Sequence, residues 1–106
     1  MPGMPPLELS GRQRKFLRGM AHAFQPVVHL GKGGLSEAVL AQIDRALDDH
    51  ELIKLRYVDN LEEKVALAAA IEDRLGCAEV GRVGHVSVFY RPQRDPEKRK
   101  IHLLGA

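Results

Sequence analysis

The sequence predicts a single α/β domain in which helices pack on a mixed sheet of about four strands. Short runs of β-branched and aromatic residues alternate with stretches of helical spacing, in the order helix, then β-α-β-α-β-β. Alternating strands and helices favour parallel strand pairs, whereas the short connection between the last two strands favours an antiparallel hairpin. The length of 106 residues agrees with one domain.

The first helix is expected from Ser10 to about His22. Ser10 and Gln13 have the spacing of a capping box, in which each side chain bonds the backbone of the other residue. Helical spacing predicts a buried stripe made of Phe16, Leu17, Met20, Ala21 and Phe24. Arg14, Arg18 and His22 are four residues apart and share another face of the helix.

A first strand is expected at Val27 to Leu30, and its apolar character favours a central position in the sheet. Ser36 is expected to cap a second helix, whose core face comprises Val39, Leu40, Ile43, Ala46 and Leu47. Leu52 to Val58 alternates as a second strand. Because Lys54 and Arg56 share one side of it, part of that face is expected to be open to solvent.

A third helix is expected to begin with a capping box at Asn60 and Glu63 and to end at Gly76. Its buried stripe is Leu67, Ala68, Ile71 and Leu75. The last two strands are expected at 77–82 and 86–90, joined by a turn with Gly84 and His85. We expect residues 1–8 to be flexible, residues 9–92 to form the domain and the charged tail 93–106 to be loose, although Ile101 to Leu104 could dock.

Charge is distributed unevenly, although the formal net charge is only +2. Residues 9–36 carry five basic side chains and no acid, whereas residues 37–82 carry eleven acids and six bases. Residues 91–100 are again mostly basic, with five bases and two acids. Basic ends around an acidic middle indicate a polyanionic partner, although a solvated basic face with no partner is the alternative.

Three glycines and a lysine follow the first strand, at Gly31, Lys32, Gly33 and Gly34. Glycine lets backbone N–H groups approach a ligand closely, and a helix start adds unpaired donors and partial positive charge. Lys32 adds a full charge at the tip. This stretch suits a phosphate group, and the alternative is a tight strand-to-helix turn that merely needs glycine.

Motifs of enzyme chemistry are not found in the sequence, so no enzyme activity is expected. The glycine-rich stretch fits neither the P-loop pattern nor the dinucleotide fingerprint, which has glycine where Ser36 stands. The five histidines lack the spacing of metal ligands and Cys77 is alone, so no disulfide, metal site or cofactor is expected. No apolar run approaches the roughly 20 residues of a membrane span, which favours a cytoplasmic protein.

The run from Ser10 to Arg91 resembles the CRM domain (chloroplast RNA splicing and ribosome maturation) in its stand-alone bacterial YhbY-like form. The matching segments are Leu17-Arg18-Gly19-Met20-Ala21-His22, Gln25-Pro26-Val27-Val28, Gly31-Lys32-Gly33-Gly34-Leu35-Ser36-Glu37-Ala38-Val39-Leu40, His50-Glu51-Leu52-Ile53-Lys54 and Tyr90-Arg91-Pro92. The resemblance implies a fold similar to the C-terminal domain of bacterial translation initiation factor three. It also implies RNA binding and association with precursors of the large ribosomal subunit. The G-x-x-G loop of the family maps onto residues 31–34, where the often polar third position is Gly33.

The expected function is therefore that of a monomeric RNA-binding protein acting in large-subunit ribosome assembly. The expected RNA contacts are Gly31, Lys32, Gly33 and Gly34, then Arg12, Arg14, Lys15 and Arg18, and lastly Lys54 and Arg56. KH domains also clamp a nucleic-acid backbone with a G-x-x-G loop. With no Trp and few aromatics, we expect recognition of RNA shape and backbone. The alternative is a protein-interaction module that docks through its open sheet face or basic helix.

Overall fold

A computed structural model describes residues 7–59 and 61–103 of the chain. The elements are α1 (Gly11–Ala21), β1 (Val28–Leu30), α2 (Glu37–His50), β2 (Leu52–Tyr57), α3 (Lys64–Leu75), β3 (Ala78–Val83) and β4 (Val86–Tyr90), with 3₁₀ turns at Leu61–Glu63 and Pro96–Lys98. The predicted order of helices and strands is confirmed. The expectations for residues 1–6, Asn60 and Leu104 lie outside the described residues.

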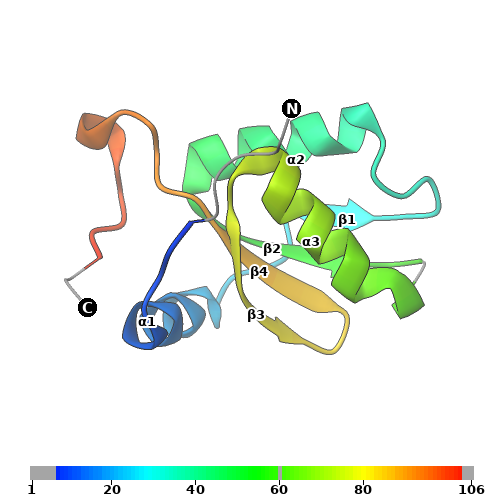
Figure 1. The fold of residues 1–106 in the computed structure, drawn as a ribbon, viewed down its shortest axis with the longest axis horizontal. Helices are drawn as coiled ribbons and strands as arrows, with labels where there is room; N and C mark the ends of the chain where they lie inside the picture. The colour runs from blue at the N-terminus through cyan, green and yellow to red at the C-terminus, as the bar shows by residue number, and fades with distance from the viewer. Residues whose placement is uncertain (1–6, 60, 104–106) are drawn as a thin grey trace.

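The four strands form one mixed sheet in the order β1-β2-β4-β3 (Figure 1). β1 runs parallel to β2, and β4 runs antiparallel to both β2 and β3. The prediction that the first strand is central is wrong, because β1 lies at an edge and pairs only with β2. Its burial alternates: Val28 and Leu30 are buried whereas His29 is exposed, so only one face of β1 is covered.

The main core lies between the sheet and the pair α2 and α3. Side chains of β2 that point to this face pack against apolar residues of the two helices: Ile53, Leu55, Tyr57, Ile43, Leu47, Ala68 and Ile71. The predicted core face of the second helix is confirmed, and Ser36 caps it by accepting a hydrogen bond from the Val39 N–H at 3.1 Å. α3 begins after a 3₁₀ turn rather than at a side-chain cap, and it ends at Gly76 in the left-handed conformation.

α1 covers part of the opposite face of the sheet, against β2, β3 and β4 (Figure 1). The predicted capping box is present, with Ser10 and Gln13 bonded reciprocally. Leu17 and Ala21 are buried in a second core with Val88 and Tyr90.

The predicted stripe on α1 is too wide. Phe16, Met20 and Phe24 are 51%, 38% and 37% exposed, respectively. A helix that packs on one sheet face buries only the side chains that point directly at the sheet. No described element covers the outer side of α1, so Phe16 and Met20 face solvent, whereas Phe24 lies in the connection to β1 and is partly exposed there.

Glu51 fixes the segment that follows β4. Its side chain is 1% exposed, and its carboxylate accepts hydrogen bonds from the backbone N–H groups of Gln93, Lys100 and Ile101 at 2.6–2.9 Å. Burial alone would raise the pKa of Glu51, but these three donors bring it below its ordinary value. Gln93, Lys100 and Ile101 are therefore tied to the domain, and Ile101 is buried in the second core, in line with the docking expected for this part of the tail.

Arg91 joins three elements just after the end of β4. Its guanidinium donates to the carboxylates of Asp44 and Asp48 on α2, at 2.7 and 2.8 Å, and to the Leu75 carbonyl at the end of α3. Arg91 is 7% exposed, whereas the side chains of Asp44 and Asp48 are 40% and 44% exposed, so the guanidinium is buried beneath two carboxylates that still contact solvent. Arg91 thus supplies the counter-charge for Asp44 and Asp48 of α2.

Candidate nucleic-acid interface

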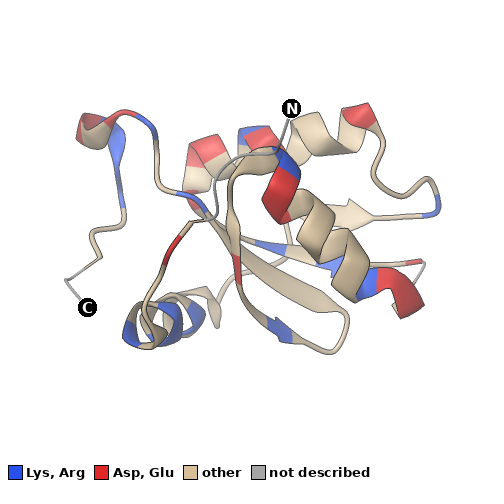
Figure 2. Ribbon diagram, viewed as in Figure 1, with Lys and Arg blue, Asp and Glu red and all other residues tan. Residues whose placement is uncertain are grey.

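The two sides of the sheet differ in charge. Acidic positions gather on α2, α3 and the turn before α3, whereas α1 carries basic positions and no acid (Figure 2). On β2, Lys54 and Arg56 alternate with buried apolar residues, so they point to the α1 side of the sheet. The acidic middle of the sequence thus forms one layer, and most of the predicted basic contacts lie on the other.

The glycine-rich loop is a tight turn with Lys32 and Gly33 exposed at its tip. The Gly34 N–H donates to the Gly31 carbonyl at 3.0 Å, so the Gly34 amide is already used within the turn. Gly34 has φ +64°, a conformation that favours glycine, whereas a Cβ at Gly31 or Gly33 would meet nothing within 4 Å. Among the described residues the Lys32 and Gly33 amides have no acceptor, so they remain available to an anion.

Arg14 and Arg18 hold α1 against the edge strand β3. Each donates from Nη1 to a backbone carbonyl of β3 at 3.0 Å, Arg14 to Glu79 and Arg18 to Val80. The stem of Arg18 also lies over Gly81, where an added Cβ would come within 2.6 Å of its Cδ. These arginines were predicted from the sequence to contact RNA. The structure shows that they also hold α1 on the sheet.

Lys54 and Arg56 lie on the uncovered part of the sheet. Lys54 Nζ donates to the carbonyls of His22 and Phe24, just after α1, at 3.3 and 3.1 Å. Arg56 is exposed and stands beside His29 in the strand register. In the described part of the chain Arg56 makes no hydrogen bond or ion pair, so its charge is free.

The predicted contacts do not form one cluster. Arg12 and Lys15 are exposed on α1 and have no partner among residues 7–59 and 61–103. The loop that carries Lys32 lies at the far end of β1, away from α1 in the view of Figure 1. Arg56 and its neighbour His29 lie on the strands between these two regions.

A hollow between α1 and the β3–β4 hairpin was not found by sequence reasoning. It has a volume of about 580 Å³ and is lined by Val83, Val86 and Val88, by Phe24 and by the basic residues Arg18, Lys54, Arg56 and Arg82. No acidic side chain lines it within the part of the chain that the structure describes. The related signal in the sequence was the pair of basic residues on one face of β2, Lys54 and Arg56. This pair predicted a solvent-exposed face of the sheet but not a hollow in it.

Other chemistries find no support in the described ranges. Burial raises the pKa of Cys77 to about 12, so its thiol is inert at neutral pH, as predicted from its position after a helix end. No group of three or more potential metal ligands occurs among the described residues. None of the described helices is long and apolar enough to cross a membrane.

The sequence matches the CRS1 / YhbY (CRM) domain over residues 9–91. The chain belongs to this family. It is 45% identical to the "RNA-binding protein" of Haemophilus influenzae, with 90% of this chain and 94% of the relative aligned. It is 35% identical to the "Probable RNA-binding protein YqeI" of Bacillus subtilis, with 90% and 98% aligned. The solution structure of the hypothetical protein SAV1595 from Staphylococcus aureus superposes with a TM-score of 0.74 at 31% identity, covering 90% of this chain and all of that one.

The CRM domain of this chain includes all ten predicted contact residues, which lie between positions 12 and 56. The matched range also ends at Arg91, the residue that ties α2, α3 and β4 together. The Glu51-bound segment that follows lies outside the matched range. That segment is nevertheless part of the packed structure, because its amides bond Glu51 within the matched range and Ile101 is buried in the second core.

Proposed function

We propose that this protein binds RNA through its α1-side face and glycine-rich loop. The observation that carries the proposal is the separation of charge, with basic side chains on α1 and on the open part of β2 and acidic ones on the opposite layer. The RNA-binding names of the relatives support it. In this proposal Lys32 and the free loop amides contact phosphate, and the exposed bases of α1 extend the contact.

The proposed target is ribosomal RNA in a precursor of the large subunit, bound in the cytoplasm. Family membership is the support for this finer assignment. Contacts with phosphate supply affinity and position but carry little sequence information. A folded assembly precursor presents many phosphates in a fixed arrangement, so a small rigid domain can recognise its shape.

Crosslinking in cells followed by sequencing of the bound RNA tests the target. We expect enrichment of large-subunit precursor sequences over mature small-subunit RNA. Sedimentation of the protein with precursor particles should fall when Arg12, Lys15 and Lys32 are changed together to alanine, because all three are exposed and unpaired among the described residues.

The matched control is Arg45→Ala, which removes an exposed, unpaired charge from α2 on the acidic layer. For each phosphate that the triple variant no longer neutralises, the slope of log affinity against log salt should flatten by about 0.7 to 0.9. The control should leave the slope unchanged. A control effect about one third of that of the triple variant, in proportion to the charges removed, would mean that net charge, and not this surface, determines binding.

A further inference from the structure

The chain between α1 and β1 forms a ridge with a hollow on each side. Phe24 and Gln25, on this ridge, line both hollows. The larger hollow is the basic one between α1 and the β3–β4 hairpin. The smaller one has a volume of about 360 Å³ and opens toward the end of α2 and the segment after β4.

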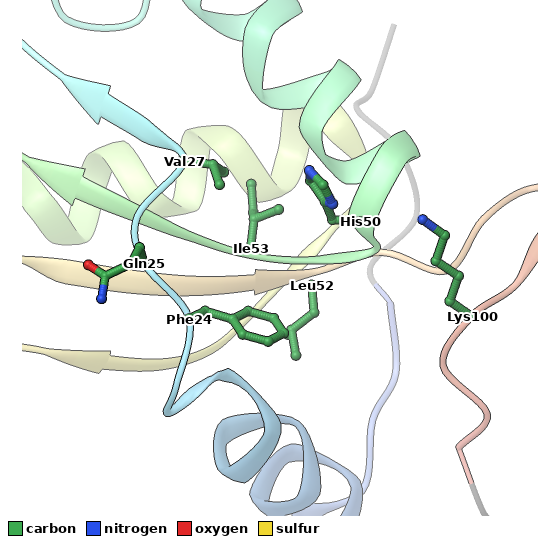
Figure 3. Close-up of a pocket in the computed structure, with 7 residues that line it drawn as sticks. All are labelled: Phe24, Gln25, Val27, His50, Leu52, Ile53 and Lys100. Carbon is green, nitrogen blue, oxygen red and sulfur yellow. The ribbon is translucent and has the colours of Figure 1, made fainter.

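The smaller hollow is apolar inside and polar at its mouth. Figure 3 shows the ring of Phe24 beside Leu52 of β2, with Ile53 on the same strand, Val27 just before β1, and His50 and Lys100 on the side of α2 and the segment after β4. No acidic side chain of the described residues lines this hollow either. An apolar cavity with a few polar groups at its rim suits a flat, partly polar ring.

Phe24 is held in place before any ligand arrives. Its N–H donates to the Ala21 carbonyl at 2.9 Å, and its own carbonyl accepts from Lys54 Nζ at 3.1 Å. The ring is nevertheless 37% exposed. These bonds fix the backbone that carries the ring, and an accessible ring on a fixed backbone can stack on a base.

We propose that an unpaired nucleotide of the bound RNA spans this ridge. Its base enters the apolar hollow and packs on Phe24, and the phosphates next to it lie in the basic hollow near Arg18 and Arg56. The inference rests on the proposed RNA-binding function and narrows it, because it requires a single-stranded segment at this point. Bases in a duplex are paired and stacked, so they cannot enter the hollow.

The charge of the lining side chains favours a nucleic acid over a protein as the molecule that binds at this ridge. The basic hollow has four cationic side chains and no acidic one among its described lining residues, and Arg56 is unpaired within the described ranges. Arg18 and Lys54 already bond backbone carbonyls, and Arg82 pairs with Glu79 at 3.8 Å. A purely apolar partner surface would nevertheless leave the Arg56 charge without compensation when it excluded water. A phosphodiester strand supplies both the anions and the flat apolar rings.

The test compares a single-stranded RNA of mixed sequence, about 16 nucleotides long, with the blunt duplex made from it and its complement. Affinity for both is measured at fixed salt for the parent, Phe24→Ala and Phe24→Leu. We expect Phe24→Ala to lose about 5- to 150-fold in affinity for the single strand and to keep its affinity for the duplex. Phe24→Leu should lose a comparable amount while melting near the parent temperature, because it keeps apolar bulk without a ring.

The matched control is Phe16→Ala, which removes another exposed aromatic ring, one that lines neither hollow. It should bind both probes like the parent. If Phe24→Ala and Phe24→Leu also bind both probes like the parent, the nucleotide site is wrong while RNA binding stands. A parent that binds neither probe would overturn the proposed function itself.

Crosslinking of the parent protein covers the case in which the Phe24 variants do not fold. The single-stranded probe then carries photoreactive 4-thiouridine, and the modified peptides are identified by mass spectrometry. We expect crosslinks at the residues that line the apolar hollow, namely Phe24, Gln25, Val27, His50, Leu52, Ile53 and Lys100. Crosslinks confined to α1 and the glycine-rich loop would overturn the inference.

Discussion

Replacing Glu51 with glutamine should loosen the segment after β4. One carboxylate oxygen accepts from the N–H groups of Lys100 and Ile101, and the other accepts from Gln93. A glutamine has only one acceptor oxygen, so its NH₂ group would face a backbone donor. Glu51 also has φ +65°, which both residue types tolerate poorly, so the backbone contribution cancels in the comparison.

The cost follows from the donor left without an acceptor. Orphaning a buried N–H costs about 1–3 kcal/mol. The two remaining bonds weaken because their acceptor is no longer charged, but glutamine avoids the burial of a charge, and these two effects oppose each other. We therefore expect Glu51→Gln to lower the free energy of unfolding by about 1–3 kcal/mol at neutral pH, with a fall of roughly 4–8 °C in Tm for each kcal/mol.

The loss should depend on pH in a defined direction. The pKa of Glu51 is lowered in the folded protein, so the carboxylate contributes stability above its unfolded pKa. This contribution disappears as the pH falls through the lower, folded pKa. The stability difference between parent and Glu51→Gln should thus be constant near neutrality and shrink below about pH 4.

Hydrogen exchange measured by NMR, together with thermal melts, checks this prediction. The amides of Gln93, Lys100 and Ile101 should be protected in the parent at neutral pH and exchange faster in Glu51→Gln. Glu51→Asp is a useful second variant, because it keeps the charge but shortens the reach. Unchanged protection of all three amides in Glu51→Gln would refute the role assigned to this carboxylate.

Three further outcomes are expected. Arg14→Ala combined with Arg18→Ala should lower Tm as well as RNA affinity, because both side chains bond carbonyls of β3; an unchanged melt would contradict the packing role. Gly34→Ala should cost about 1–2 kcal/mol in a chemical denaturation experiment and Gly33→Ala almost nothing, since only Gly34 has positive φ; equal costs would contradict this. Cys77 should resist alkylation at pH 8 until the protein is unfolded, because its pKa is about 12; rapid labelling of the native protein would argue against its burial.

Much of the fold could be predicted because local signals and packing agree. The capping box at Ser10, the cap at Ser36 and the glycine at position 76 mark helix ends through hydrogen bonds between near neighbours in the sequence. The alternation of apolar and basic residues along β2 correctly placed Ile53, Leu55 and Tyr57 on the core face and Lys54 and Arg56 on the other. These features depend on a few adjacent residues, so the sequence alone reveals them.

The features that sequence reasoning missed depend on contacts between distant segments. The width of the buried stripe on α1 was overestimated, because helical spacing does not tell whether one or two layers of structure cover a helix. In the structure one layer covers it, and Phe16 and Phe24 are exposed. An acidic residue such as Glu51 is normally solvated, and only the return of residues 93–101 buries it. The edge position of β1 likewise depends on which strands occupy the places next to β2.

Arg91 and Glu51 also govern when the fold can close as the chain leaves the ribosome. Arg91 follows its carboxylate partners on α2 by 43 and 47 residues, and the amides that bind Glu51 follow it by 42 to 50 residues. Until those later residues emerge, Asp44 and Asp48 lack the guanidinium that pairs with them, and Glu51 lacks the amides that bond it. The basic residues of the N-terminal helix and the glycine-rich loop thus leave the ribosome well before the residues that complete the acidic layer.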